Sequence, residues 1–175
     1  ATRFDLSNNA CLTSIQQPFD ELLEDHRLTE LQELDLSSCT ELVALPTRLD
    51  LMSSLQTLIL AYCASLKELP SSLGGASNLV RIDLEYCGNL RSIPTSCGQL
   101  SRLEDLDLEQ CHSLIALPSS MAKLASLKKL MVWGCTALRA MPDLSGMTLL
   151  DLGALPEEIA KWEQGGRKEC ERLFR

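Results

Sequence analysis

The stretch LQELDLSSCTELVALP at residues 31–46 decides the fold, and LEDLDLEQCHSLIALP at residues 103–118 repeats its pattern. The same pattern returns every 24 residues through the middle of the chain. Four of its aligned columns are Leu31, Leu55, Leu79, Leu103, Leu127; Leu34, Leu58, Ile82, Leu106, Leu130; Cys39, Cys63, Cys87, Cys111, Cys135; and Pro46, Pro70, Pro94, Pro118, Pro142. Because so many columns hold their residue type over five registers, the sequence predicts a repeat protein.

The periodicity changes partway through each repeat. The L-x-L core alternates with period 2, which predicts a short strand. After the cysteine the apolar spacing becomes three, and the following proline cannot donate to a strand ladder. The rest of the unit is too short for a long helix, so we expect a 3₁₀ turn or irregular segment there. One unit cannot bury its own leucines, whereas stacked units can, with a parallel sheet on one face and leucines behind it.

With these residues in place, the unit L-x-L-x-x-C-x-x-L-x-x-L-P-x-x-L resembles the cysteine-type repeat of the leucine-rich repeat family. The 24-residue form is similar to repeats of plant intracellular nucleotide-binding immune receptors and of plant-targeting bacterial effectors. The resemblance implies an α/β fold: a right-handed solenoid with a concave parallel β-sheet, short 3₁₀ or irregular convex segments, and a C-terminal helical cap. It is specific for the fold and weak for the biological role, because this architecture carries unrelated functions.

The ends depart from the regular repeat. We expect a solenoid of about six to seven units over residues 1–155 and a helical cap over 156–175. An opening unit places Asn9 at the cysteine position, and its extra residues near Asp20–Arg27 predict a short acidic helix on the convex side. Leu150 and Leu152 predict one more strand, and Pro156 followed by two glutamates predicts a helix start.

Composition excludes several function classes. Of the 175 residues 37 are leucine, and the formal net charge is −8. This charge opposes binding to nucleic acid and to anionic membranes. Eight cysteines in a secreted protein would suggest disulfides, but five of them share one repeat position. We therefore expect Cys39, Cys63, Cys87, Cys111 and Cys135, with Asn9, to be a structural ladder of reduced side chains in a cytoplasmic protein.

Catalytic and cofactor motifs are missing from the sequence. Neither histidine belongs to a zinc-ligand spacing, and there is no phosphate-binding glycine motif. Cys111 beside His112 could suggest a nucleophile and base, but the cysteine column is expected to point inward. Asp105 and Asp107 fit a charged solvent-exposed face better than an acid–base pair. We therefore predict no enzyme activity, no cofactor and no metal.

A ligand would contact the positions that the repeat leaves variable, on the concave face. There, eight carboxylates stand beside three cations in the five regular units, and three of the seven aromatic residues join them. Exposed aromatics next to charge are typical of binding hot spots. A plain solvated face is the alternative, since any such sheet needs polar residues. The candidate partner-binding residues are Ile59, Tyr62, Arg81, Asp83, Glu85, Tyr86, Asp105, Asp107, Glu109, Lys129, Met131 and Trp133.

Three functions fit this reading. The first is a protein-recognition module, resembling the sensing part of an intracellular plant defence receptor, whose protein partner presents a basic segment. The second is the substrate-targeting domain of a bacterial effector or ubiquitin ligase. The third is a passive scaffold. The sequence leaves the partner's identity and the oligomeric state open.

Overall fold

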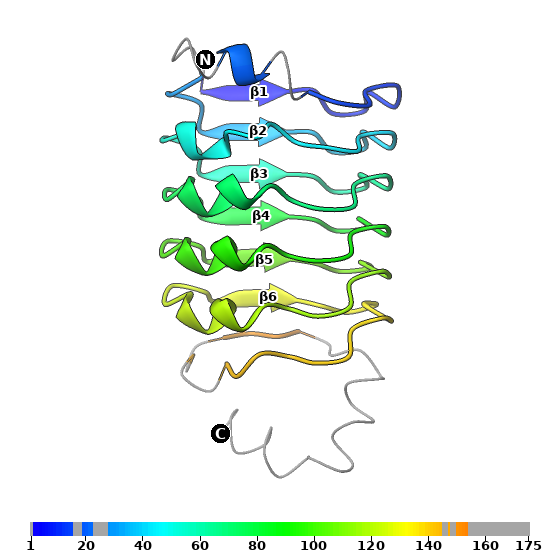
Figure 1. The fold of residues 1–175 in the computed structure, drawn as a ribbon, viewed down its shortest axis with the longest axis vertical. Helices are drawn as coiled ribbons and strands as arrows, with labels where there is room; N and C mark the ends of the chain where they lie inside the picture. Colours follow the sequence, from blue (N-terminus) through cyan, green and yellow to red (C-terminus); the bar gives the residue numbers. More distant parts are fainter. Residues whose placement is uncertain (1, 16–18, 23–27, 145–146, 148–149, 154–175) are drawn as a thin grey trace.

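The computed structural model describes residues 2–15, 19–22, 28–144, 147 and 150–153. Short strands stack into one parallel sheet in sequence order, like the rungs of a ladder (Figure 1). The strands are β1 (Arg3–Asp5), β2 (Glu33–Asp35), β3 (Thr57–Ile59), β4 (Arg81–Asp83), β5 (Asp105–Asp107) and β6 (Lys129–Met131). This open parallel sheet confirms the solenoid predicted from the repeat.

The strand register follows the sequence repeat without slippage. Leu34 pairs with Leu58, and Ile82 with Leu106. The opening unit is confirmed as well, because Phe4 pairs with Leu34 although that unit is longer. Within its extra length residues 19–22 are helical, and Phe19 packs edge to face against Phe4 with ring centroids 5.5 Å apart. The remainder of the expected helix falls on residues 23–27, outside the described part of the chain.

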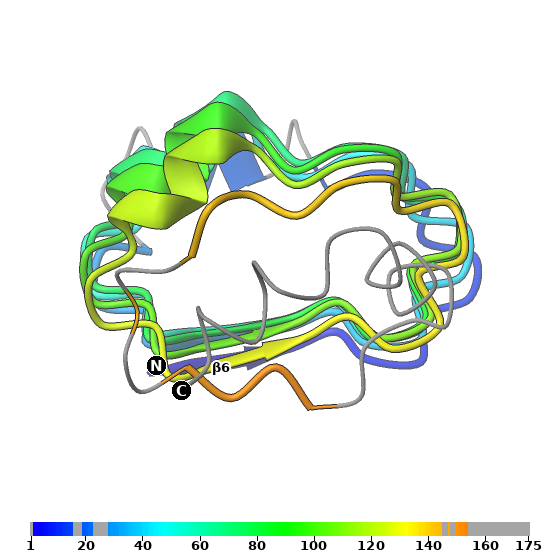
Figure 2. The same ribbon diagram turned by 90° about the horizontal axis from the view of Figure 1, so that it is seen from below.

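The convex side carries short 3₁₀ segments, which lie across the core from the sheet when the stack is viewed along its axis (Figure 2). Proline precedes three of them, and its fixed φ suits the start of a helical turn. Successive segments pack so closely that a Cβ on Gly74 would collide with the carbonyl oxygen of Ser96. The segments are η1 (Leu49–Leu51), η2 (Ser71–Gly75), η3 (Thr95–Gln99) and η4 (Ser119–Lys123).

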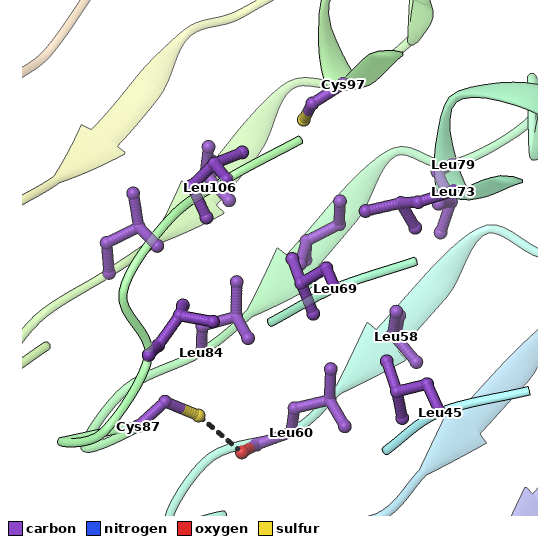
Figure 3. Packing of buried hydrophobic residues seen from close by; sticks show 14 of the residues in the cluster. Leu45, Leu58, Leu60, Leu69, Leu73, Leu79, Leu84, Cys87, Cys97 and Leu106 are labelled. Carbon is purple, nitrogen blue, oxygen red and sulfur yellow. Dashed lines mark hydrogen bonds between the residues drawn. The ribbon is translucent and has the colours of Figure 1, made fainter. Parts of the chain in front are cut away.

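A continuous apolar core fills the space between the sheet and the 3₁₀ segments. The repeated leucine positions of the five regular units are buried, including Leu58, Leu84 and Leu106 (Figure 3), except that Met141 of the fifth unit is half-buried. Cys97 occupies a leucine position of its unit and is also buried. Each unit contributes one layer to this core, so a single unit would leave its leucines in water.

The C-terminal part of the described chain begins one more rung. The N–H of Leu130 donates to the carbonyl of Asp151 at 2.8 Å, and Lys129 and Asp151 form an isolated parallel bridge. This pairing agrees with the strand expected around Leu150 and Leu152. The predicted cap over 156–175 lies outside the described residues. Within the described segments, no helix has the length and apolar character needed to cross a membrane.

Candidate functional site

The cysteine column lies inside the solenoid and links neighbouring units. Each thiol donates to the carbonyl of a leucine one unit earlier, for example Cys63 to Leu36 at 3.1 Å and Cys87 to Leu60 at 3.2 Å (Figure 3). The other three thiols of the column do the same. In the opening unit the side-chain amide of Asn9 donates to the carbonyl of Leu6 at 2.5 Å. Each thiol thus gives the leucine carbonyl a second donor beside the backbone N–H of the cysteine in that carbonyl's own unit, as for Leu36, Leu60 and Leu84.

Burial makes the thiols of Cys63, Cys87 and Cys97 poor nucleophiles by raising their pKa. It raises the pKa of Cys63 to about 12 and that of Cys97 to about 12. All the cysteines in the described segments are free thiols. His112 is exposed and its Nδ1 lies 3.0 Å from the carbonyl oxygen of Gly134, while the neighbouring Cys111 points inward to a leucine carbonyl. Among the described residues no group of three or more metal-ligating side chains has a geometry that could hold an ion.

The aspartates at the strand ends are structural caps. Oδ1 of Asp83 accepts the N–H of Glu85 at 3.2 Å, and Oδ1 of Asp107 accepts the N–H of Glu109 at 2.9 Å. The same turn is made by Asp5, Asp35 and Asp151. An aspartate side chain that bonds the N–H two residues on stabilises a chain reversal. Asp83 and Asp107 therefore owe their place first to the turn.

Asp35 differs from its expected position. Its place in the repeat predicts an exposed side chain on the concave face, yet the residue is only 8% exposed. Its carboxylate accepts the hydroxyl of Ser37 at 2.7 Å and lies 3.4 Å from the guanidinium of Arg3. These donors take the place of the water that an exposed carboxylate would bind, which allows Asp35 to be buried.

The first position of the strands carries charges of alternating sign. Arg3 stands beside Glu33 at 3.1 Å, and Arg81 beside Asp105 at 3.8 Å. Lys129 is the next residue in register with Asp105. Arg81 also holds Asp83 at 3.0 Å. The charge in this column is thus largely balanced within the sheet.

Two glutamates beyond the strand ends carry charge that the sheet does not balance. Glu85 and Glu109 occupy the same column in successive units, and neither makes an ion pair within the described segments. Partial burial and the neighbouring carboxylates raise the pKa of Glu85. Partial burial likewise raises the pKa of Asp107, with Asp83 and Asp105 adding to it. We call Glu85, Glu109 and Asp107 the acidic centre of this face.

Two tyrosines form a stacked pair next to this acidic centre. The rings of Tyr62 and Tyr86 are 4.8 Å apart and inclined by only 9°, and the residues are 46% and 41% exposed. Both lie just after the strands, in turns with left-handed backbone at φ 64° and 58°. The equivalent residues are Asn8, Ser38, Gln110 and Gly134, all left-handed too. A bulky aromatic residue rarely adopts this conformation.

Each tyrosine is tied by its backbone to one of the two glutamates. The N–H of Tyr62 donates to the carbonyl of Glu85 at 2.8 Å, and the N–H of Tyr86 to that of Glu109 at 2.8 Å. The charge of Glu85 raises the pKa of the Tyr62 phenol, as expected for a carboxylate close to the ring. The tyrosine stack and the glutamate pair are therefore one contiguous surface.

The remaining candidate residues surround this surface. Trp133 is 49% exposed and follows Glu85 and Glu109 in their column, one unit further on. Ile59 and Met131 are half-buried and occupy the strand-end position that aspartate fills elsewhere. Of the twelve predicted residues, seven lie in β3–β6, three lie two residues past the end of a strand, and the two tyrosines lie in the turns.

No family model and no curated protein matches the chain. The leucine-rich repeat domain of the type III effector XopL is 25% identical, with a TM-score of 0.53, over 77% of this chain and 55% of that one. A leucine-rich repeat protein of Leptospira interrogans is 22% identical with a TM-score of 0.41, over 93% of this chain and 58% of that one. The plant peptide hormone receptor RGFR1, in complex with RGF2, is 20% identical with a TM-score of 0.44, over 81% and 32%.

The chain spans about half the length of the XopL domain that it matches. That likeness, together with the parallel ladder and the buried cysteine column, shows that the chain has the leucine-rich repeat fold.

Proposed function

We propose that this leucine-rich repeat solenoid is a non-enzymatic protein-recognition module whose concave face binds a segment of another protein. The observation behind the proposal is the surface formed by the stacked Tyr62 and Tyr86, by Glu85 and Glu109, which make no ion pair with other described residues, and by the exposed Trp133. Tyrosine and tryptophan dominate binding hot spots because they bury much area with little conformational freedom to lose.

The charge of this face favours a basic partner segment. Arg81 is already engaged by Asp83 and Asp105, so it does not neutralise the two glutamates. An acidic face attracts a cationic segment at long range and raises its association rate. A neutral solvated face would need neither the uncompensated charge nor the aromatic pair.

For the biological setting, we favour the sensing part of a cytoplasmic plant-type defence receptor. The support is the sequence resemblance of its cysteine-type repeats and the series of buried thiols, which suits a reducing compartment. The second candidate is the targeting domain of a bacterial effector, and the XopL likeness favours it.

The test is affinity capture from plant and bacterial lysates with mass-spectrometric identification. Wild-type protein is compared with Tyr86→Gly/Trp133→Ala and with Val43→Ala/Ile115→Ala, which removes exposed apolar side chains outside the candidate surface. We expect a partner that is lost with the first variant and retained with the second. Equal capture by all three would place the contact elsewhere and contradict the proposal.

Association kinetics test the charge argument separately. Glu85→Lys/Glu109→Lys is preferable to changing Asp83 and Asp107, because those aspartates cap turns. With the captured partner, this variant should associate more slowly than wild type, and its association rate should rise rather than fall with added salt. An unchanged rate at low salt would remove the acidic centre from the site.

A further inference from the structure

We propose that the surface formed by Glu85, Glu109 and the Tyr62–Tyr86 stack is a binding site for the side chain of an arginine in an extended partner segment. This inference rests on the proposed function and names the chemistry of the partner. The main observation is that Glu85 and Glu109, which make no ion pair within the described segments, are joined to the two stacked tyrosines by backbone hydrogen bonds, and that the charge of Glu85 acts on the Tyr62 phenol.

The backbone of this surface is rigidly placed. Glu85 and Glu109 occupy one column of adjacent units, and successive strands of a sheet lie about 4.8 Å apart. The N–H groups of Tyr62 and Tyr86 hold the carbonyls of these two glutamates from the next column. The result is a two-by-two arrangement in which the backbone of each glutamate is bonded to that of a tyrosine.

The two glutamates have no cation of their own within the described segments. Arg81 points its guanidinium to Asp83 and Asp105, and Lys128 pairs with Glu104 at 2.7 Å. Mutual repulsion among the carboxylates is visible in the raised pKa of Glu85, after the contribution of partial burial. A bound cation would reduce this repulsion, so the charges of the free protein favour cation binding here.

Arginine fits this arrangement better than lysine. Its planar guanidinium can lie on an aromatic face and still direct several N–H donors to carboxylates in the same plane. Lysine carries a compact and strongly hydrated charge that gains less from a ring face. A metal ion is a poor alternative, because the described residues offer no ligand cluster of suitable geometry.

The backbone conformation supports a role for the tyrosine rings. The other left-handed residues of this column are serine, asparagine, glutamine and glycine, whose side chains are smaller or polar. Placing two aromatic residues at φ 64° and 58° costs conformational energy that glycine, which stands at position 134 of this column, would avoid. The stack recovers part of that energy, and a ligand that uses the rings accounts for their presence here.

Trp133 adds a second contact at a defined spacing. It lies one unit beyond Glu109, and therefore two units, or about 10 Å, along the stack from the level of Tyr86. An extended peptide advances about 3.3 Å per residue. A segment running along the stack would therefore place an apolar residue about three positions from the arginine.

The test is selection of binders from a random displayed peptide library on immobilised full-length chain, followed by titration of synthetic peptides. The selected peptide is measured as such, with its arginine replaced by lysine, and with it replaced by the neutral isostere citrulline. The protein variants are Glu85→Gln/Glu109→Gln, the charge-matched control Glu41→Gln/Glu68→Gln at exposed sites off the concave face, and Tyr86→Gly/Trp133→Ala.

We expect the selected peptides to share an arginine with an apolar residue about three positions away. Their affinity should fall at least fivefold with lysine and at least tenfold with Glu85→Gln/Glu109→Gln, and stay unchanged with the control variant. Peptides without arginine that are still lost with Tyr86→Gly/Trp133→Ala would overturn the arginine site and leave the proposed function standing. Peptides that bind every variant equally, or no enrichment at all, would overturn both.

Discussion

The left-handed position of Tyr86 leads to a prediction in which the usual order of alanine and glycine is reversed. Tyr86→Ala and Tyr86→Gly both remove the ring and its stack with Tyr62. Their difference in stability therefore reports the backbone alone. Left-handed backbone costs a residue with a Cβ about 1–2 kcal/mol, and the greater freedom of glycine in the unfolded chain offsets about 0.5–1 kcal/mol of that. The glycine variant should be more stable by about 0.5–1 kcal/mol.

Glu85 provides the matched control, because it precedes Tyr86 and lies outside the left-handed set. There Glu85→Ala should be more stable than Glu85→Gly by about 0.5–1 kcal/mol, the ordinary order for regular backbone.

Urea unfolding followed by circular dichroism measures both pairs. With a slope of about 2 kcal/mol per molar urea, the expected midpoint shifts are roughly 0.3–0.5 M and of opposite sign at the two positions. If alanine were the more stable residue at position 86 as well, the backbone argument for that turn would be wrong.

Three further predictions concern the core, the thiols and the acidic centre. Leu108→Ala should lower the free energy of unfolding by about 2–5 kcal/mol, measured by urea unfolding, because Leu108 is fully buried and its removal leaves a cavity. Cys11 is exposed and should react with iodoacetamide in the native state, whereas Cys63, whose pKa is raised to about 12, should react only on unfolding. Mass spectrometry of the labelled peptides measures the two rates, and equal rates would contradict the buried column. The pKa of Glu85 is raised in the folded protein, so the folded state binds the carboxyl proton of Glu85 more tightly than the unfolded chain does. The free energy of unfolding should therefore fall as the pH rises from the ordinary pKa of 4.5 through the raised pKa. Glu85→Gln should remove that part of the decline, and a parallel pH profile for wild type and variant would refute the assignment.

The sequence predicts the repeating part of the fold because each repeated sequence position occupies the same place in successive structural units. Leu34, Leu58 and Ile82 are aligned by spacing and are found in register in adjacent strands. The spacing also places Tyr62 and Tyr86 in one column, so their neighbourhood could be inferred. Their stacking could not, because the left-handed turn that sets the ring direction has no consistent residue type in this column.

The charges show where prediction from the sequence fails. Counting acids gives the same weight to Asp83 and Glu85, yet the first caps a turn and pairs with Arg81, while the second does neither. The signal was present in the spacing, since the aspartate column precedes the turn by the same interval in five units. The burial of Asp35 is not visible in the repeat pattern, because it depends on Ser37 and on Arg3, which belongs to the longer opening unit.

The charges at the first strand position also determine which repeat units can lie next to one another without repulsion. Because the units from β2 to β6 share one length and one register, the chain could be shortened by one whole unit there without disturbing the leucines. Excising residues 45–68 would bring Glu33 beside Arg81, a favourable neighbour. Excising 93–116 would instead bring Arg81 beside Lys129 and so place two cations on adjacent strands without a carboxylate between them. The column thus distinguishes turns that are otherwise interchangeable, and it makes some edited lengths of this solenoid more stable than others.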